Sequence, residues 1–276
     1  MHRISRDTIT KDTTLCMSLS ARPSNIGTRF HNFLYEELGL DFVYKAFTTT
    51  DLPAAIAGIR ALGIRGCGVS MPFKEACIEF VDVMHPSAAA IDSVNTLVNE
   101  DGVLHAYNTD YEAVATLIAD RGVDPASTVA VAGSGGMAKA VVAALRDNGF
   151  RAVTVVARNA TTGRALAQRY GFAWRPELGD LRPRLLVNAT PIGMAGGPGA
   201  DDLPFDADAV AASEVVFDVV ALPPETPLIR AAVELGRTVV TGAEVIALQA
   251  AAQFALYTGV RPTPDQVRRA SEFSRA

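Results

Sequence analysis

One stretch near the middle of the chain, Val129 to Ala140, most constrains the fold. It reads Val-Ala-Val-Ala-Gly-Ser-Gly-Gly-Met-Ala-Lys-Ala. The four small or β-branched apolar residues predict a buried parallel strand, and the residues after the glycines predict a helix. Such a turn lets the backbone approach a phosphate, which free N–H groups and the helix dipole attract. The spacing Gly-x-Gly-Gly alone is also compatible with an ordinary glycine-rich turn.

The next predicted strand, Arg151 to Val156, indicates which dinucleotide would bind. Ala157, Arg158 and Asn159 follow it, at the position where dinucleotide folds meet the adenosine ribose. No acidic residue stands there to accept a hydrogen bond from the ribose 2′-hydroxyl of NAD, whereas Arg158 can pair with a 2′-phosphate. We therefore predict NADP as the cofactor. The alternative is that Arg158 is an ordinary surface residue.

Composition limits the class of protein and the partners. A chain of 276 residues is long for one core, so one large or two modest domains are expected. The net charge of −5, without a long run of one sign, argues against binding to nucleic acid or to an anionic membrane. No apolar run reaches membrane-spanning length, and Met1 to Lys11 lacks the apolar core of a signal peptide.

Cysteine and histidine usage predicts a reduced protein without a metal. The three cysteines are odd in number and lack metal-like spacing, which favours a cytoplasmic location. The four histidines are scattered, so no metal site is expected.

The first hundred residues predict an α/β domain that brings a lysine to a strand-to-helix junction. Strands are predicted over Leu15 to Leu19, Phe42 to Phe47 and the short Gly66 stretch, with helices between them. Pro72 would stand in the first turn of a further helix, which places Lys74 at its start. A lysine is disfavoured at the positive end of a helix dipole, so a role as general acid/base or in substrate positioning is one interpretation. A solvent-facing lysine beside Glu75 is the other.

A second polar junction follows a predicted hairpin. Ile91 to Val98 and Asp101 to Ala106 are predicted strands, joined by a turn over 99–102. They lead through Asn-Thr-Asp110 to a helix over Tyr111 to Ala119. Asp110 is either a partner for proton transfer or simply the N-cap of that helix.

From Thr128 onward the chain predicts a doubly wound domain of Rossmann type. Strands and helices alternate up to the strand Thr238 to Thr241, which implies a parallel sheet with right-handed crossovers. Two more helices, Val245 to Gly259 and one after Pro264, come after this sheet is complete. We expect them to pack back on the first domain, so that residues 1–109 and 243–276 form an N-terminal α/β substrate domain and residues 110–242 the NADP-binding domain.

Several motifs in order resemble the shikimate dehydrogenase family over nearly the whole chain. They are Gly-Val-Ser-Met-Pro-Phe-Lys74, Val-Asn95-Thr, Asn-Thr-Asp110, the Gly133 turn, Arg158, Asn188-Ala-Thr-Pro-Ile-Gly-Met194, Thr226-Pro-Leu, and Gly242 through Gln249-Ala-Ala. The resemblance implies an NADP-dependent oxidoreductase that interconverts 3-dehydroshikimate and shikimate, a small cyclic hydroxy acid.

The resemblance also implies roles for individual residues. Lys74 and Asp110 would form the catalytic pair, with Lys74 protonating the ketone oxygen as hydride arrives from a nicotinamide in a cleft between the domains. The substrate would be held by Asn25, Ser70, Asn95 and Gln249. The cofactor would be held by Gly133, Ser134, Gly135, Gly136, Met137, Arg158, Asn159, Val219 and Gly242. A homodimer is left open.

Four departures from the family pattern bear on the substrate. An ungapped count from His31 puts Asn25 and Gly27 at the two serines of the family's carboxylate-binding Ser-x-Ser-Pro motif. Phe73 replaces a polar histidine, Ala221 a tyrosine and Glu244 a glycine. They suggest a divergent branch that keeps the redox residues. The same chemistry on quinate or an aminoshikimate-like compound, and a non-catalytic NADP-binding sensor, are the alternatives.

Overall fold

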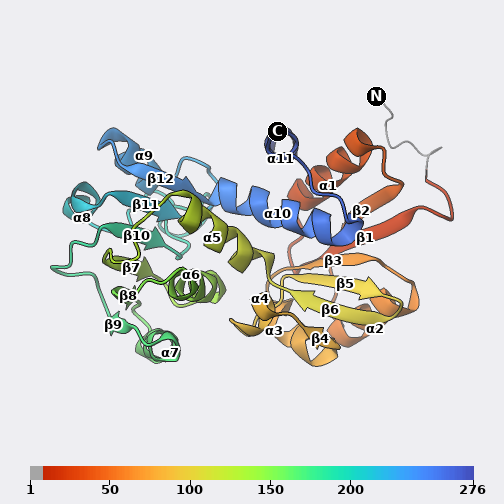
Figure 1. Cartoon of the computed structure of the whole chain (residues 1–276), viewed down its shortest axis with the longest axis horizontal. Coiled ribbons are helices and arrows are strands. Elements are labelled where there is room, and N and C mark those ends of the chain that lie inside the picture. Colours follow the sequence, from red (N-terminus) through yellow and green to blue (C-terminus); the bar gives the residue numbers. More distant parts are fainter. Residues whose placement is uncertain (1–8) are drawn as a thin grey trace. The chain divides into compact units, whose positions relative to one another are not determined.

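The computed structural model describes residues 9–276, which divide into two compact units (Figure 1). The predicted N-terminal residues Met1 to Thr8 lie outside the described range. One unit contains residues up to Thr109 together with Ala247–Ala276, and the other contains Asp110–Ile246. Two helices run across the boundaries in the sequence, α5 (Thr109–Asp120) and α10 (Gly242–Thr258).

The first unit is built on a mixed sheet of six strands in the order β2-β1-β3-β5-β6-β4. The strands β1, β2 and β3 are parallel, whereas β5 is antiparallel to both β3 and β6. Its elements are β1 (Thr14–Leu19), α1 (Asn25–Leu38), β2 (Phe42–Phe47), α2 (Leu52–Ala61), β3 (Gly66–Val69), α3 (Phe73–Ala76), the 3₁₀ turn η1 (Cys77–Phe80), β4 (Val83–Met84), α4 (Pro86–Ala89), β5 (Thr96–Glu100), β6 (Val103–Tyr107) and α11 (Pro264–Arg275).

Both faces of this sheet are covered, because successive strand residues point to opposite sides. In β1, Met17 packs with α2 residues such as Ile56 on one side. On the other side Cys16 packs with aromatic residues of α1 and α10, including Tyr35 and Phe254. The helices α1 and α11 pack against each other at this second face (Figure 1). The prediction that the C-terminal helices return to the first domain is therefore confirmed.

The second unit is a parallel sheet in the order β12-β11-β10-β7-β8-β9. Numbered from β7, this is the doubly wound order 3-2-1-4-5-6, and it confirms the Rossmann prediction. The elements are β7 (Val129–Ala132), α6 (Gly136–Asp147), β8 (Val153–Val156), α7 (Ala160–Tyr170), β9 (Ala173–Arg175), β10 (Leu185–Asn188), α8 (Ala207–Ala212), β11 (Val215–Asp218), α9 (Pro227–Glu234) and β12 (Thr238–Thr241).

Three local predictions differ from the structure. The strand predicted from Ile91 begins only at Thr96, because Asp92 has a positive φ of 47° and breaks extended backbone. The helix predicted after Pro72 is a single α-helical turn continued by η1. Asp110 lies inside α5, which already begins at Thr109, so it is not the N-cap.

His31 of α1 is an ionisable group at the centre of the aromatic cluster. It is fully buried and stacks on Tyr44 with ring centroids 4.4 Å apart. Within the described part of the chain its ring nitrogens make no hydrogen bond of ordinary geometry, and the nearby Gln253 compensates only weakly. Burial therefore lowers the pKa of His31 to about 3. The imidazole is neutral in the folded protein at neutral pH.

His31 should make stability fall as the pH falls. The unfolded chain takes up a proton near the model value of 6.5, whereas the folded chain resists it down to about 3. In this window the free energy of unfolding should decrease by up to roughly 1.4 kcal/mol per pH unit through this residue. Urea unfolding of wild type and His31→Phe at pH 7, 6, 5 and 4 measures the difference. Parallel curves for the two proteins would contradict the assignment.

Candidate functional site

Lys74 is carried by the short turn α3 and is half-buried. Two backbone hydrogen bonds fix this turn: Phe73 N–H donates to the carbonyl of Ser70 at 2.9 Å, and Val94 N–H donates to the carbonyl of Lys74 at 2.8 Å. The second bond ties the lysine backbone to the residue that precedes Asn95. Lys74 and Asn95 are therefore positioned by the same stretch of chain.

Asn95 and Thr109 form a buried pair at the carboxyl-terminal side of the β5–β6 hairpin. The Thr109 backbone N–H donates to Asn95 Oδ1 at 2.8 Å, and Asn95 Nδ2 donates to Thr109 Oγ1 at 3.0 Å. Asp110, which is half-buried, directly follows Thr109 in the first turn of α5. This double bond therefore sets where the backbone delivers the carboxylate.

Gln249 of α10 joins the same group. Its Oε1 accepts a hydrogen bond from Thr109 Oγ1 at 3.4 Å, and its side chain is half-buried. The structure thus brings Asn95 and Gln249 together around Thr109. Both predicted substrate-binding amides belong to the first unit.

Ser70 and Asn25 stand at the exposed ends of two elements of the first unit. Ser70 follows β3, and its backbone N–H donates to the carbonyl of Leu19 at 2.9 Å. Asn25 is the first residue of α1 and is exposed; the N-cap, Ser24, makes no side-chain capping bond. The first-turn N–H groups of α1 therefore keep their preference for an anion.

The Gly133 turn of the second unit fits a phosphate. Gly133 has φ 114°, and a Cβ there would lie 2.7 Å from the carbonyl oxygen of Ala189, so only glycine is accommodated. Gly135 and Gly136 face open space, since an added Cβ would meet nothing within 4 Å. Gly135 caps α6 without a side-chain hydrogen bond. A pyrophosphate can therefore approach the backbone at the positive end of α6.

The residues after β8 fit the ribose end of a dinucleotide. Arg158 is exposed, and Asn159 uses its Oδ1 to cap α7 by accepting from Thr161 N–H at 3.0 Å and Thr162 N–H at 3.2 Å. Ser134 of the glycine turn shares a 2.8 Å hydrogen bond with Thr162. The glycine turn and the start of α7 are thus joined, and Arg158 lies beside that junction in the sequence.

Val219 and Gly242 follow the ends of β11 and β12. The Val219 N–H donates to the carbonyl of Asn188 at 3.0 Å. A Cβ on Gly242 would lie 2.4 Å from the carbonyl oxygen of Val219, so the two backbones are in direct contact. Met137, in the first turn of α6, is half-buried. All these predicted cofactor residues lie at or just after the carboxyl ends of strands.

Comparison with known proteins identifies the family. Residues 25–97 match the model of the shikimate dehydrogenase substrate-binding domain. A shikimate dehydrogenase-like protein of Haemophilus influenzae is 55% identical over 267 residues, which cover 97% of this chain and 98% of that relative. This chain belongs to the shikimate dehydrogenase family.

Two solved structures agree with this assignment. A shikimate 5-dehydrogenase-like protein is 54% identical with a TM-score of 0.95, over 97% of this chain and 100% of the other. The shikimate 5-dehydrogenase of Thermus thermophilus, solved with NADP(H) and shikimate, is 31% identical with a TM-score of 0.85, over 95% and 99% of the two chains. The recognition from sequence motifs is confirmed.

Sequence reasoning missed three residues of the first unit. Thr109 and Thr96 were noticed only as parts of motifs, and Gln253 only as a polar interruption of an apolar helix. Gln253 lies four residues after Gln249 on α10, which places both on one helical face. That spacing was the available signal.

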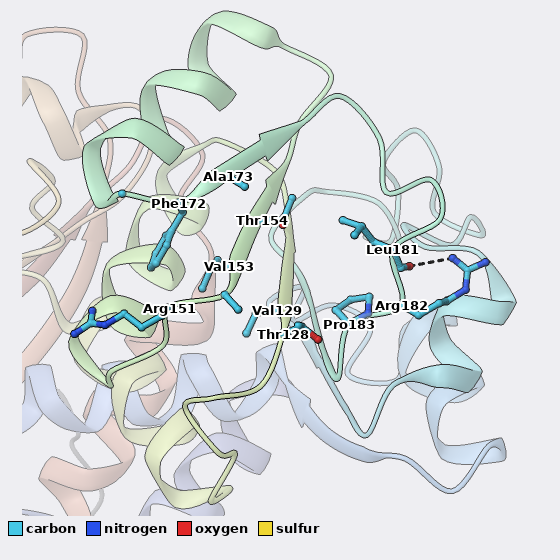
Figure 2. Close-up of a pocket in the computed structure, with 12 residues that line it drawn as sticks. Thr128, Val129, Arg151, Val153, Thr154, Phe172, Ala173, Leu181, Arg182 and Pro183 are labelled. Atoms are coloured by element: carbon cyan, nitrogen blue, oxygen red, sulfur yellow. Dashed lines mark hydrogen bonds between the residues drawn. The ribbon is translucent and has the colours of Figure 1, made fainter.

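The groove shown in Figure 2 is not part of this site. It has a volume of about 270 Å³ and is lined by Arg151, Phe172 and Arg182, among others. These residues lie just before β8, β9 and β10, at the amino ends of the strands. In Figure 2 both arginine side chains extend away from the apolar centre, and Arg182 bonds the carbonyl of Leu181 at 2.9 Å. The groove therefore lies at the opposite edge of the sheet from the glycine turn.

Searches for two other kinds of feature found nothing in residues 9–276. This range contains no group of three or more His, Cys, Asp or Glu side chains arranged to hold a metal ion. It also contains no helix that is both long and apolar enough to span a membrane.

A buried carboxylate supports the loops of the cofactor side. Asp218, at the end of β11, accepts hydrogen bonds from Thr226 Oγ1 at 2.6 Å, Asn188 Nδ2 at 2.9 Å and Val220 N–H at 3.0 Å. Burial raises the pKa of Asp218 to about 6 despite these donors. The loops after β10 and β11 are therefore joined by one titrating group.

Asp218 should act on stability with the opposite sign to His31. The folded protein favours its protonated form, so its stabilising contribution is complete below about pH 3.8 and is lost as the pH rises through about 6. Relative to Asp218→Asn, the wild type should lose roughly 3 kcal/mol of unfolding free energy between pH 3.8 and 7. Urea unfolding across this range is the measurement. A pH-independent difference between the two proteins would refute the raised pKa.

Proposed function

We propose that this protein is an NADP-dependent oxidoreductase that interconverts a ketone and a secondary alcohol on a cyclic hydroxy acid of the shikimate type. The observation that carries the proposal is the Asn95–Thr109 pair, because it joins the segments that bear Lys74 and Asp110. Membership of the shikimate dehydrogenase family supports the reaction type.

Lys74 is proposed as the general acid/base. Its ammonium group donates a proton to the ketone oxygen during reduction, and the neutral amine accepts it back from the alcohol during oxidation. Asp110 orients the ammonium and favours its charged form. When bound, NADP supplies the hydride acceptor and NADPH the hydride donor.

The cofactor side of the proposal assigns three groups of this chain. The backbone N–H groups of the Gly133 turn and the start of α6 bind the pyrophosphate. The Arg158 guanidinium pairs with the 2′-phosphate in a charge-assisted hydrogen bond. Asn159 holds the start of α7 and so keeps the neighbouring loop in place.

The substrate carboxylate is proposed to lie near the start of α1. Asn25 offers an exposed amide there, and the helix dipole favours a negative charge. The two serines of the family motif are absent, and each lost hydroxyl contact weakens binding by about 1 kcal/mol. Quinate and aminoshikimate therefore stand beside shikimate as candidate substrates. The retention of Lys74, Asp110 and Asn95 argues against a non-catalytic NADP sensor.

Lys74→Ala should abolish most turnover without loss of the cofactor. Removing a general acid/base typically lowers kcat by about 10²- to 10⁴-fold. Assays of NADPH absorbance with shikimate, quinate and aminoshikimate, and NADP titration by fluorescence, give the two readouts. Lys45→Ala, at an exposed lysine of β2, is the matched control. Undiminished turnover in Lys74→Ala on a substrate used by the wild type would exclude the assigned role.

Arg158→Leu should change cofactor preference. Loss of a hydrogen bond to a charged group corresponds to a Kd for NADP raised by roughly 10- to 100-fold, while the Kd for NAD should hardly change. Arg151→Leu is the control, because Arg151 lies before the other end of the same strand, β8. Equal weakening of NADP and NAD binding in Arg158→Leu would show that this arginine does not read the 2′-phosphate.

A further inference from the structure

Gln253 lies beneath the predicted substrate-binding amide Asn95. Its side chain is 6% exposed, and its Nε2 donates to the backbone carbonyl of Asn95 at 3.2 Å and to Thr96 Oγ1 at 3.0 Å. A backbone carbonyl can only accept, so the atom facing it is the amino group of Gln253. The orientation of this buried amide is therefore determined by its neighbours.

The Gln253 contact fixes the direction of the Thr96 hydroxyl. Thr96 Oγ1 accepts from Gln253, and its own single proton has a short partner in Asn95 Oδ1 at 2.7 Å. The identity of that oxygen is also certain, because the Thr109 backbone N–H, which can only donate, faces it at 2.8 Å. Hydrogen bonds thus run in one direction from Gln253 through Thr96 to Asn95.

The consequence is a fixed polarity for Asn95. Its Oδ1 is already occupied by the Thr96 hydroxyl and the Thr109 N–H. Its Nδ2 carries two hydrogens, of which one is directed to Thr109 Oγ1. The second hydrogen is left for a ligand. Asn95 can therefore serve a ligand as a donor and not as an acceptor.

Gly68 makes this arrangement sterically possible. In the antiparallel pairing of β3 with β5, Gly68 lies opposite Thr96. A Cβ on Gly68 would lie 3.5 Å from Gln253 Nε2 and 2.9 Å from the Tyr44 hydroxyl. The missing side chain leaves the space through which Gln253 reaches across β3 to Thr96.

We propose that Gln253 is a positioning residue that acts through Thr96 to hold Asn95 as a hydrogen-bond donor toward a substrate oxygen. This inference rests on the proposed function, since it concerns how that site recognises a hydroxyl or carboxylate oxygen. Gln253 itself does not touch the substrate. It sets which atom of Asn95 the substrate meets.

The test compares hydroxyl-removing and hydroxyl-keeping variants with shikimate as the probe. Thr96→Val and Gln253→Leu should each raise the KM for shikimate about 10-fold, the effect of one lost hydrogen bond, and change kcat less than about threefold. Thr96→Ser keeps the hydroxyl and should restore the wild-type KM. Because both residues act through one hydroxyl, the double variant should lose no more than Thr96→Val alone.

Thr258→Val is the matched control, since Thr258 Oγ1 bonds the carbonyl of Phe254 on the same helix, away from Asn95. The KM for NADP should stay constant throughout. An unchanged KM for shikimate in Thr96→Val and Gln253→Leu would overturn the proposal. So would a parallel loss of kcat and Tm in all variants, Thr96→Ser included, because that pattern indicates a merely structural role.

A separate readout applies if the wild type turns over none of the cyclic acids, in which case the proposed function itself fails. Side-chain amide exchange of Asn95, followed by NMR in the ligand-free protein, then decides the positioning role. Exchange should be slow in wild type and Thr96→Ser, and about 10-fold faster in Thr96→Val. Equal exchange rates in the three proteins would refute it.

Discussion

The candidate site depends on one hydrogen bond, from the backbone N–H of Thr109 to Asn95 Oδ1 at 2.8 Å. A backbone N–H cannot change its role, so this bond determines which end of the Asn95 amide is the acceptor. It also joins the segment before β5 to the start of α5. The polarity of Asn95 and the backbone position of Asp110 both follow from it.

The two units solve different binding problems with different kinds of group. The second unit offers backbone N–H groups at a glycine turn, which suit a phosphate of any attached group. The first unit offers side-chain amides whose orientation is held by buried neighbours, which suit the individual oxygens of a small polar ligand. The division explains how a family can keep its cofactor turn while residues such as Asn25 and Gly27 change around the substrate.

Sequence patterns predicted most of the regular structure, because buried parallel strands and glycine-ended helices leave strong local signals. The strand β12 was predicted with its observed bounds, whereas the three-residue β9 and the six-residue α8 were missed because they are too short to show a period. Lys74 and Asn95 were found by motif. Gln253 was not, since its role depends on the pairing of Gly68 with Thr96 across two strands.

The central claim is that a cyclic hydroxy acid binds in the first unit with Asn95 as donor and Lys74 at the reacting oxygen. A crystal structure of the protein with NADP⁺ and shikimate tests it most directly. The account predicts Asn95 Nδ2 and Lys74 Nζ each within about 3.2 Å of a ligand oxygen. A ligand bound elsewhere, or a ligand hydroxyl facing Asn95 Oδ1, would contradict it.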